Sequence, residues 1–369
     1  MPGNGENGEA KILIIGGGVA GLATARALAR EGIGFYLVER AKVLGGMVLG
    51  SRSVFPVMET GERVVAELVQ GLEGCRCGEV MLDAEVISVR KDGGAFEAEV
   101  KVGTGERSGS GPQHRNLRAA ALVVATGLEP VDASLIPELG YPALKDVVLS
   151  TSFGSLFSGD GLHRPSDGSK VRTVAFVQCV GSRVERRGVP YCSAVCCMNA
   201  LKNAILVREI DDSIMTYVLY IDIRTHGKGY ESLYRRAREK GVRFIRGQPS
   251  MIVSSPGSGR LLVVGENTLL KELYEIPADL VVLGVGLRQR QENLELLRDL
   301  GVELDPDALA GGSQEMESVR TSVPGIFLAG CVEAPKDVRE SIAQGEAAAM
   351  SAIGLISRSS REKDTDLVR

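Results

Sequence analysis

The chain has 369 residues, a formal net charge of −4 and a sequence pI of about 5.7. This mildly acidic balance excludes the strongly basic surface of nucleic-acid binders, and the lack of tryptophan with only 4% aromatic residues excludes base-stacking platforms. No apolar run approaches the roughly 20 residues of a membrane span, so we expect neither nucleic acid nor a membrane crossing.

Both ends of the chain read as polar tails. The first eight residues lack the apolar core of a secretion signal, and residues 357–369 are rich in serine and charge. Without such a signal we expect a cytoplasmic protein in a reducing compartment. Clustered cysteines there act more often as metal ligands or redox thiols than as structural disulfides.

An apolar strand near the N-terminus runs into the turn Gly16-x-Gly18-x-x-Gly21, and a helix-like run continues to Arg30. A second apolar strand ends in Glu39, 18 positions after Gly21. Strand, glycine turn, helix, second strand and acid in this order predict a dinucleotide-binding site. The glycines permit a tight turn and close approach of a pyrophosphate to the helix N-terminus, and the acid can accept hydrogen bonds from a ribose.

Three later features favour FAD over NAD at this site. A glycine pair at positions 45–46 follows the acid in a loop where backbone can approach a flavin, and a buried strand ends in Ala-Thr-Gly at 125–127. A last strand ends at Gly330, and a helix is expected over residues 338–356. Together these features resemble the thioredoxin-reductase-like flavoproteins, and the resemblance implies that the N-terminal dipole of that helix stabilises negative charge on a reduced flavin.

Between these features the sequence alternates strands and helices, which predicts an α/β fold with parallel, doubly wound sheets. In the first half we expect a helix over residues 63–72, strands over 85–90 and 96–102, and a loop over 103–116. A strand over 171–179 opens a second unit, followed by helices over 190–208 and 229–240 and strands over 215–221 and 243–246. We expect a discontinuous FAD-binding domain of residues 1–150 and 285–369, with a second Rossmann-like domain, residues 151–284, inserted in it.

The inserted domain lacks a second glycine turn where its first strand ends. That strand runs into Cys179, and only Gly181 remains of the expected motif. Cys192, Cys196 and Cys197 follow at the start of the next helix, with Cys192 and Cys196 expected on one helix face. Four thiolates at the place that a pyrophosphate would otherwise take suit a [4Fe–4S] cluster. Tetrahedral zinc, a redox dithiol and buried core thiols are the alternatives that the spacing leaves open.

Several segments resemble one known family. Together with the glycine turn, residues 177–183, 191–202, 222–230 and 329–337 resemble the flavoprotein subunit of heterodisulfide reductase, which is thioredoxin-reductase-like and has two dinucleotide folds. The resemblance implies a [4Fe–4S] cluster beside FAD, with Cys179, Cys192, Cys196 and Cys197 as its ligands. It also implies that the chain passes electrons within a multi-subunit complex that acts on disulfides.

The same resemblance implies a set of FAD contacts. Cys331 stands where related flavoproteins carry an aspartate toward the ribityl chain. The expected FAD-binding residues are Gly16, Gly18, Val19, Ala20, Gly21, Glu39, Arg40, Gly45, Gly46, Met47, Val86, Ala125, Thr126, Gly127, Gly330, Cys331, Val332, Ser341 and Gln344.

The chain also departs from the family pattern. It lacks the ferredoxin-like Cys-x-x-Cys-x-x-Cys-x-x-x-Cys-Pro insertions of larger members, and residues 55–60 carry no further cysteine. Electron bifurcation that feeds several clusters is therefore not expected. The compact form resembles the heterodisulfide-reductase-like flavoprotein of sulfur oxidisers, which implies the other subunits of that complex and a lipoate-carrying protein as partners, and a homodimeric state.

Lys202 and the pair Cys75 and Cys77 lie outside these motifs. Lys202 interrupts an apolar helix, where its side chain either snorkels to solvent or reaches the flavin ring and tunes its potential; we name it as the candidate catalytic residue. On a strand, the side chains of Cys75 and Cys77 would point to opposite faces, which is unfavourable for a disulfide. We expect incidental thiols there, with a redox or second-cluster role as the alternative.

Three rival functions remain. A stand-alone NAD(P)H-dependent disulfide reductase needs a second glycine turn and a Cys-x-x-Cys, and the sequence has neither. A sulfide:quinone-reductase-like enzyme needs an amphipathic membrane anchor, which the charged C-terminus does not offer. A scaffold whose cysteines bind structural zinc is a rival from another functional class, and metal analysis with visible and EPR spectra would separate it from the main hypothesis.

Overall fold

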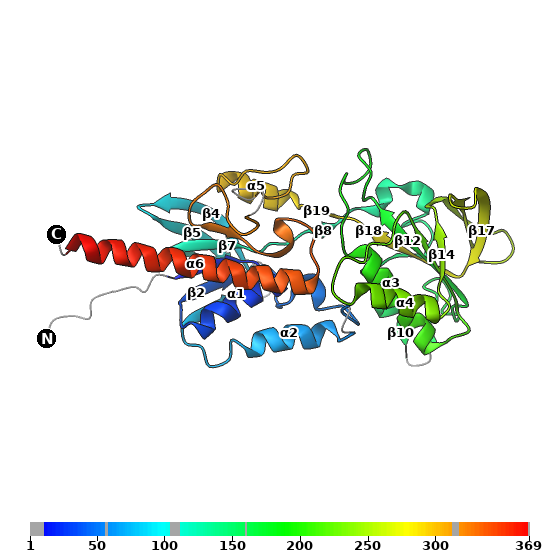
Figure 1. The fold of residues 1–369 in the computed structure, drawn as a ribbon, viewed down its shortest axis with the longest axis horizontal. Helices are drawn as coiled ribbons and strands as arrows, with labels where there is room; N and C mark the ends of the chain where they lie inside the picture. Colours follow the sequence, from blue (N-terminus) through cyan, green and yellow to red (C-terminus); the bar gives the residue numbers. More distant parts are fainter. Residues whose placement is uncertain (1–10, 56–57, 104–110, 159–160, 312–316, 368–369) are drawn as a thin grey trace. The chain divides into compact units, whose positions relative to one another are not determined.

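The computed structural model describes residues 11–55, 58–103, 111–158, 161–311 and 317–367, so the predicted N-terminal tail lies outside it (Figure 1). The chain forms two compact units: residues 1–49, 62–128 and 289–369, and residues 50–61 and 129–288. The second unit begins at 129 rather than 151, ends at 288 rather than 284, and takes in residues 50–61. Strand β8 (Glu129–Pro130) pairs with β19 (Leu287–Arg288), which joins the points where the chain enters and leaves this unit.

The first unit is built on a parallel five-stranded sheet in the order β20-β7-β1-β2-β3. Its strands are β1 (Ile12–Ile15), β2 (Phe35–Val38), β3 (Gly78–Met81), β7 (Ala121–Val124) and β20 (Ile326–Leu328). Every residue of β1 and β7 is buried, as is typical of parallel strands covered on both faces. The predicted strand–turn–helix–strand order at the N-terminus is confirmed.

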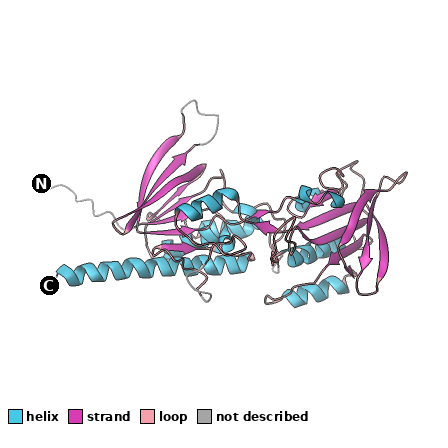
Figure 2. Ribbon diagram, turned by 90° about the horizontal axis from the view of Figure 1, so that it is seen from above, coloured by secondary structure: helices cyan, strands magenta, loops and turns pink. Residues whose placement is uncertain are grey.

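Helix α1 (Val19–Arg30) lies beside α6 (Val338–Leu367) (Figure 1), the long helix that leads to the C-terminus in Figure 2. Thr24 Oγ1 donates to the carbonyl oxygen of Gly345 at 3.0 Å. A Cβ atom at Gly345 would lie 2.4 Å from the carbonyl oxygen of Ala20, so only glycine permits this close approach. The predicted C-terminal tail is wrong up to residue 367, because residues 355–367 contain neither glycine nor proline and continue the helix.

An antiparallel sheet also belongs to the first unit. It consists of β4 (Ala84–Asp92), β5 (Ala95–Val102) and β6 (Gln113–Ala119). Strand β6 includes part of the predicted loop over 103–116, since residues 113–116 pair with β5; residues 104–110 lie outside the described chain. Helix α2 (Gly61–Gln70) begins at the boundary of this unit, and α5 (Gln291–Asp299) was not predicted.

The second unit contains a parallel five-stranded sheet in the order β14-β13-β12-β18-β9. Its strands are β9 (Val147–Leu149), β12 (Thr173–Val180), β13 (Met215–Tyr220), β14 (Arg243–Arg246) and β18 (Leu280–Val285). One face packs on α3 (Cys196–Ile210) and α4 (Tyr230–Glu239). The other packs on an antiparallel sheet of β15 (Pro249–Ser254), β16 (Leu261–Asn267) and β17 (Glu272–Ala278).

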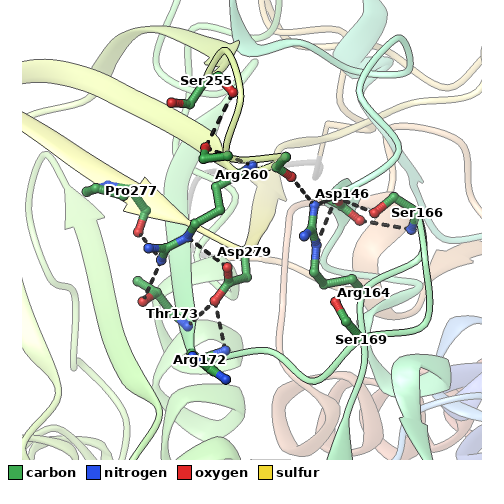
Figure 3. A network of polar contacts seen from close by, with 12 residues as sticks. Asp146, Arg164, Ser166, Ser169, Arg172, Thr173, Ser255, Arg260, Pro277 and Asp279 are labelled. Atoms are coloured by element: carbon green, nitrogen blue, oxygen red, sulfur yellow. Dashed lines mark hydrogen bonds and ion pairs between the residues drawn. The ribbon is translucent and has the colours of Figure 1, made fainter.

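A buried polar network fixes one end of this unit (Figure 3). Asp146 accepts a hydrogen bond from Arg164 Nη2 at 2.6 Å. Asp279, just before β18, accepts from the backbone N–H of Thr173 and from Arg260 Nε, both at 2.8 Å. Buried charges are tolerated when they are paired and hydrogen-bonded in this way, so we assign the network a structural role.

The remaining short elements complete the description of the fold. They are β10 (Phe157–Ser158), β11 (Gly161–Leu162) and the 3-10 turns η1 (Gly46–Val48), η2 (Ala133–Leu135), η3 (Pro137–Leu139), η4 (Phe153–Leu156) and η5 (Gly330–Val332). Within the described ranges, no helix combines the length and the apolar character that a bilayer crossing requires.

Candidate functional site

The glycine turn between β1 and α1 leaves space at a single position. Gly21 cannot carry a side chain, because a Cβ there would lie 1.9 Å from the carbonyl oxygen of Gly16. Gly18 differs: its φ of −71° suits any residue, and no described atom lies within 4 Å of where its Cβ would be. The free space therefore lies directly before Val19, where the N-terminus of α1 offers unpaired N–H groups to an anion.

A second glycine loop lies beside this turn. Gly45 donates its backbone N–H to the carbonyl oxygen of Gly17 at 2.8 Å, and Gly18 and Gly45 form an isolated parallel bridge. A Cβ on Gly46 would approach Gly18 Cα to 3.2 Å. The predicted turn and the predicted glycine pair thus lie together, and main-chain atoms of both border the space at Gly18. Arg40 and Met47 lie exposed near this loop.

Glu39 stands at the end of β2, next to the glycine turn. Its Oε2 accepts the backbone N–H of Gly17 at 2.6 Å, and its Oε1 accepts that of Ala41 at 2.7 Å. These two bonds orient the carboxylate at the sheet edge where the turn begins. The ribose contact expected of Glu39 stays a prediction.

The segment after β7 supplies two further polar features. The hydroxyl of Thr126 is buried and has no hydrogen-bond partner among the described residues. Asn293, on the unpredicted helix α5, donates its Nδ2 to the carbonyl oxygen of Gly127 at 2.9 Å. A buried hydroxyl without a partner is uncommon in a native fold and fits a site that a ligand completes.

Gln344 and its neighbours hold the turn after β20. Oε1 of Gln344 accepts the backbone N–H of Gly330 at 2.7 Å. Cys331 Sγ donates to the carbonyl oxygen of Lys336 at 3.3 Å and lies 4.0 Å from Ser341 Oγ, and burial raises the pKa of its thiol. Among the other predicted residues, Val19, Ala20, Ala125 and Val332 are buried, and Val86 is half-buried on β4.

The four clustered cysteines lie in the second unit, where β12 ends and α3 begins. Cys179 is the last residue but one of β12 and has a φ of +59°. Cys196 and Cys197 open α3, whereas Cys192 lies in the preceding loop. The predicted shared helix face of Cys192 and Cys196 is therefore wrong. The physical reason is Ala194, whose φ of +56° is incompatible with a helix that starts earlier.

Three of these cysteines affect one another's pKa through hydrogen bonding of the Cys196 thiol. The Cys196 thiol acts as the donor, which lowers the pKa of Cys179 and lowers the pKa of Cys197 to about 7. The same bonds raise the pKa of Cys196 well above its usual value. The guanidinium of Arg183, which pairs with Asp222 at 2.9 Å, lowers the pKa of Cys179 and Cys197 further.

Cys192 joins the group only through electrostatics. The pKa of Arg183 is raised first by its bond to Asp222, and also by the charges of Cys179 and Cys192. Within the described residues, no group of three or more histidine, cysteine, aspartate or glutamate side chains is arranged to hold a metal ion. The chemistry of the donor set nevertheless fits a thiolate-bound cluster, since Cys179, Cys192 and Cys197 interact with one guanidinium and Cys196 interacts with Cys179 and Cys197.

Gln178 provides a second observation that fits a bound group beside the four cysteines. Its side chain is 1% exposed, and neither amide atom has a hydrogen-bond partner among the described residues. It precedes Cys179 and faces Gly284, whose Cβ would lie 2.8 Å from Gln178 Oε1. An orphaned amide in the residue before a candidate ligand fits a group with acceptor atoms at this strand end.

Lys202 does not snorkel. Only 6% of it is exposed, and its Nζ donates to the carbonyl oxygen of Ser53 at 2.8 Å. Burial lowers the pKa of Lys202 to about 8. The solvent-facing alternative is thus wrong, and the expected role at a flavin ring stays a prediction.

Cys75 and Cys77 form a disulfide, contrary to the expectation from sequence. The expectation assumed a strand, but both residues precede β3 in a turn that brings their side chains to the same side. The backbone N–H of Cys77 points at Cys75 Sγ at 3.3 Å.

The family model described as pyridine nucleotide-disulphide oxidoreductase matches residues 10–157 and 223–352, which is well over half of the chain. The chain belongs to this family. As a member it is a flavin-dependent oxidoreductase. Residues 158–222, which the family model leaves unmatched, contain all four clustered cysteines and Lys202.

Named relatives refine this membership and confirm the predicted resemblance. An iron-sulfur subunit of CoB–CoM heterodisulfide reductase from Methanocaldococcus jannaschii is 33% identical over 92% of this chain and 63% of its own length. A counterpart from Methanopyrus kandleri is 32% identical over 93% of this chain and 64% of its length. The chain therefore spans less than two thirds of these relatives.

Solved structures of thioredoxin reductases share the fold. The enzyme from T. acidophilum matches with a TM-score of 0.63 and 21% identity, covering 95% of this chain and 99% of its own. That from Lactococcus lactis matches with a TM-score of 0.64 and 19% identity over the same shares. The predicted thioredoxin-reductase-like architecture of two Rossmann-like domains is confirmed.

Proposed function

We propose that this protein is a FAD- and [4Fe–4S]-containing electron-transfer subunit of a heterodisulfide-reductase-like complex in disulfide or sulfane-sulfur metabolism. The observation that carries the proposal is the end of β12, which runs into Cys179 instead of a second glycine turn. The name iron-sulfur subunit in the M. jannaschii relative supports it.

Backbone and one carboxylate would hold FAD in the first unit. The space at Gly18 and the N–H groups at the start of α1 suit the pyrophosphate, and Glu39 suits the adenosine ribose. The hydroxyl of Thr126 and the backbone at Gly46 would provide further polar contacts. Bound FAD supplies two-electron chemistry, and the residues named here position it and exclude water.

Four thiolates would hold the cluster in the second unit: Cys179, Cys192, Cys196 and Cys197. Hydrogen bonding from the Cys196 thiol and the positive charge of Arg183 lower the pKa of Cys179 and, most of all, that of Cys197, which favours the deprotonated state that metal binding requires at these two positions. The pKa of Cys196 is raised instead, so this thiol would lose its proton only on binding the metal. Gln178 would donate its amide N–H toward the sulfur atoms. A [4Fe–4S] cluster supplies one-electron chemistry.

The rival function is a stand-alone NAD(P)H-dependent disulfide reductase, as the family name would suggest. Anaerobic mixing with NADH or NADPH separates the two, with the flavin absorbance as the readout. We expect no bleaching within seconds, because the second unit offers no glycine turn for a pyrophosphate, whereas dithionite should bleach the flavin fully. Rapid and complete bleaching by either nucleotide would favour the rival.

Lys202 gives a pH-dependent prediction. Its pKa is about 8 in the folded protein against 10.5 for a free side chain, so the unfolded chain binds more protons between these values and stability rises with pH. We expect the free energy of unfolding to gain about 3 kcal/mol from pH 8 to pH 10.5 relative to Lys202→Met. Circular dichroism in denaturant measures it, since the chain has no tryptophan. Parallel pH curves for the two proteins would contradict the assignment.

The same variant tests the expected role at the flavin. If the Lys202 ammonium tunes the flavin, Lys202→Met shifts the flavin reduction potential, and an unchanged potential removes Lys202 from the proposed site.

We propose as partners the other heterodisulfide-reductase-like subunits and a lipoate-carrying protein. We also propose that the chain is a homodimer and lies in the cytoplasm.

A further inference from the structure

The Cys75–Cys77 disulfide lies apart from the flavin site of its own unit. It occupies the turn between α2 and β3, at the amino end of β3. Strands β1, β2 and β3 are parallel neighbours, and the glycine turn follows the carboxyl end of β1. The disulfide and the glycine turn therefore lie at opposite ends of the parallel strands of one sheet.

The turn does not need this bond to hold its shape. Cys75 donates its backbone N–H to the carbonyl oxygen of Leu72, and Phe35 donates to that of Cys77, both at 3.2 Å. Both cysteine side chains also pack against the apolar core of the first unit. A bond between residues two positions apart constrains the unfolded chain little, because the entropic gain grows with the size of the closed loop. A purely stabilising role is therefore weakly supported.

The surroundings of the pair suit thiol chemistry. Both cysteines are half-buried, and Arg76 between them is exposed. A disulfide that is only partly buried is accessible to an attacking thiolate, and a positively charged residue between the two cysteines favours the thiolate that forms when the bond opens. Cys179, Cys196 and Cys197, by contrast, are buried.

We propose that Cys75 and Cys77 form a second redox site, a dithiol–disulfide couple that exchanges with a dithiol on a partner protein. A thiolate of the partner attacks one sulfur, the Cys75–Cys77 bond breaks, and a mixed disulfide forms while the released thiolate takes a proton from water. The second partner thiol then attacks the mixed disulfide and releases the other cysteine. The pair gains two electrons and two protons, and the partner leaves as a disulfide.

The full-length protein tests this in glutathione buffers that range from fully oxidised to fully reduced. After acid quenching and alkylation, cleavage after glutamate yields residues 74–79, a peptide that contains both cysteines. We expect this peptide to change from the disulfide to the doubly alkylated form within this range, with both cysteines reduced at the same buffer potential. A disulfide that survives excess reduced glutathione, or a dithiol that survives oxidised glutathione, would overturn the proposal.

A kinetic comparison tests the partner class. Dithiothreitol should reduce the pair at least about tenfold faster than 2-mercaptoethanol at equal thiol concentration, since its second thiol resolves the mixed disulfide within one complex. Equal rates would contradict a dithiol partner.

A double variant, Cys75→Ser with Cys77→Ser, supplies the control for a structural role. We expect its melting temperature, flavin content and iron content to equal those of the parent protein. A large fall in melting temperature would show that the bond is a staple and overturn the proposal. The peptide alkylation and the reduction rates described above report only the thiol state and use neither flavin nor iron. Their outcome is therefore independent of the proposed electron-transfer function.

Discussion

Replacing Gly18 with valine should weaken flavin binding by about 100-fold and leave the fold intact. The backbone of Gly18 has an ordinary φ, and no described atom lies within 4 Å of the position of its Cβ, so the protein accepts the side chain. The added methyl groups would instead occupy the space assigned to the pyrophosphate, and overpacking of a filled site costs about 1–3 kcal/mol. Titration of the flavin-free protein with FAD measures the change in the dissociation constant.

Gly111→Val is the matched control. Gly111 belongs to the same unit, and it too has no described atom within 4 Å of its Cβ position. It lies far along the sequence from both glycine loops, so its flavin affinity should equal that of the parent. If the Gly18 and Gly111 variants bind flavin equally well, the turn before α1 does not hold the pyrophosphate.

Serine at any one of the four clustered cysteines should remove the cluster almost completely. The parent protein, isolated without oxygen, should carry about four iron atoms per chain, and each variant fewer than about one, because a four-thiolate cluster is labile with three ligands. Cys179, Cys192, Cys196 and Cys197 would each be replaced separately, and iron analysis with visible spectra provides the measurement.

Two observations keep that result interpretable. The proposed flavin site lies in the first unit and the proposed cluster site in the second, so retained flavin would show that a variant is folded even when its iron is lost. The Cys75→Ser and Cys77→Ser double variant, whose cysteines lie in the first unit, should keep its iron. If the four single variants keep the iron content of the parent, these residues are not the ligands.

Patterns that depend on neighbours in sequence predicted well. The apolar run before Gly16 gave a buried strand because parallel strands are covered on both faces, and Gly21 had to be glycine because the helix passes so close to the turn. The family-like segments around the cysteines identified relatives that the comparisons confirm.

Features set by distant contacts or by single backbone angles could not be read in this way. The second unit begins at Glu129 because β8 pairs with β19, more than 150 residues later in the chain. Lys202 is buried because it meets Ser53, 149 positions away. Helix α3 starts late because Ala194 adopts a positive φ, which nothing in the residue type signals.

The central claim is that four thiolates have replaced the pyridine-nucleotide turn of the family. Metal and flavin analysis of oxygen-protected protein, combined with EPR spectra after dithionite reduction, tests it most directly. The account predicts about four iron atoms and one flavin per chain, with the EPR signal of a reduced [4Fe–4S] cluster. One flavin with no iron, or with a single zinc ion in its place, would contradict it.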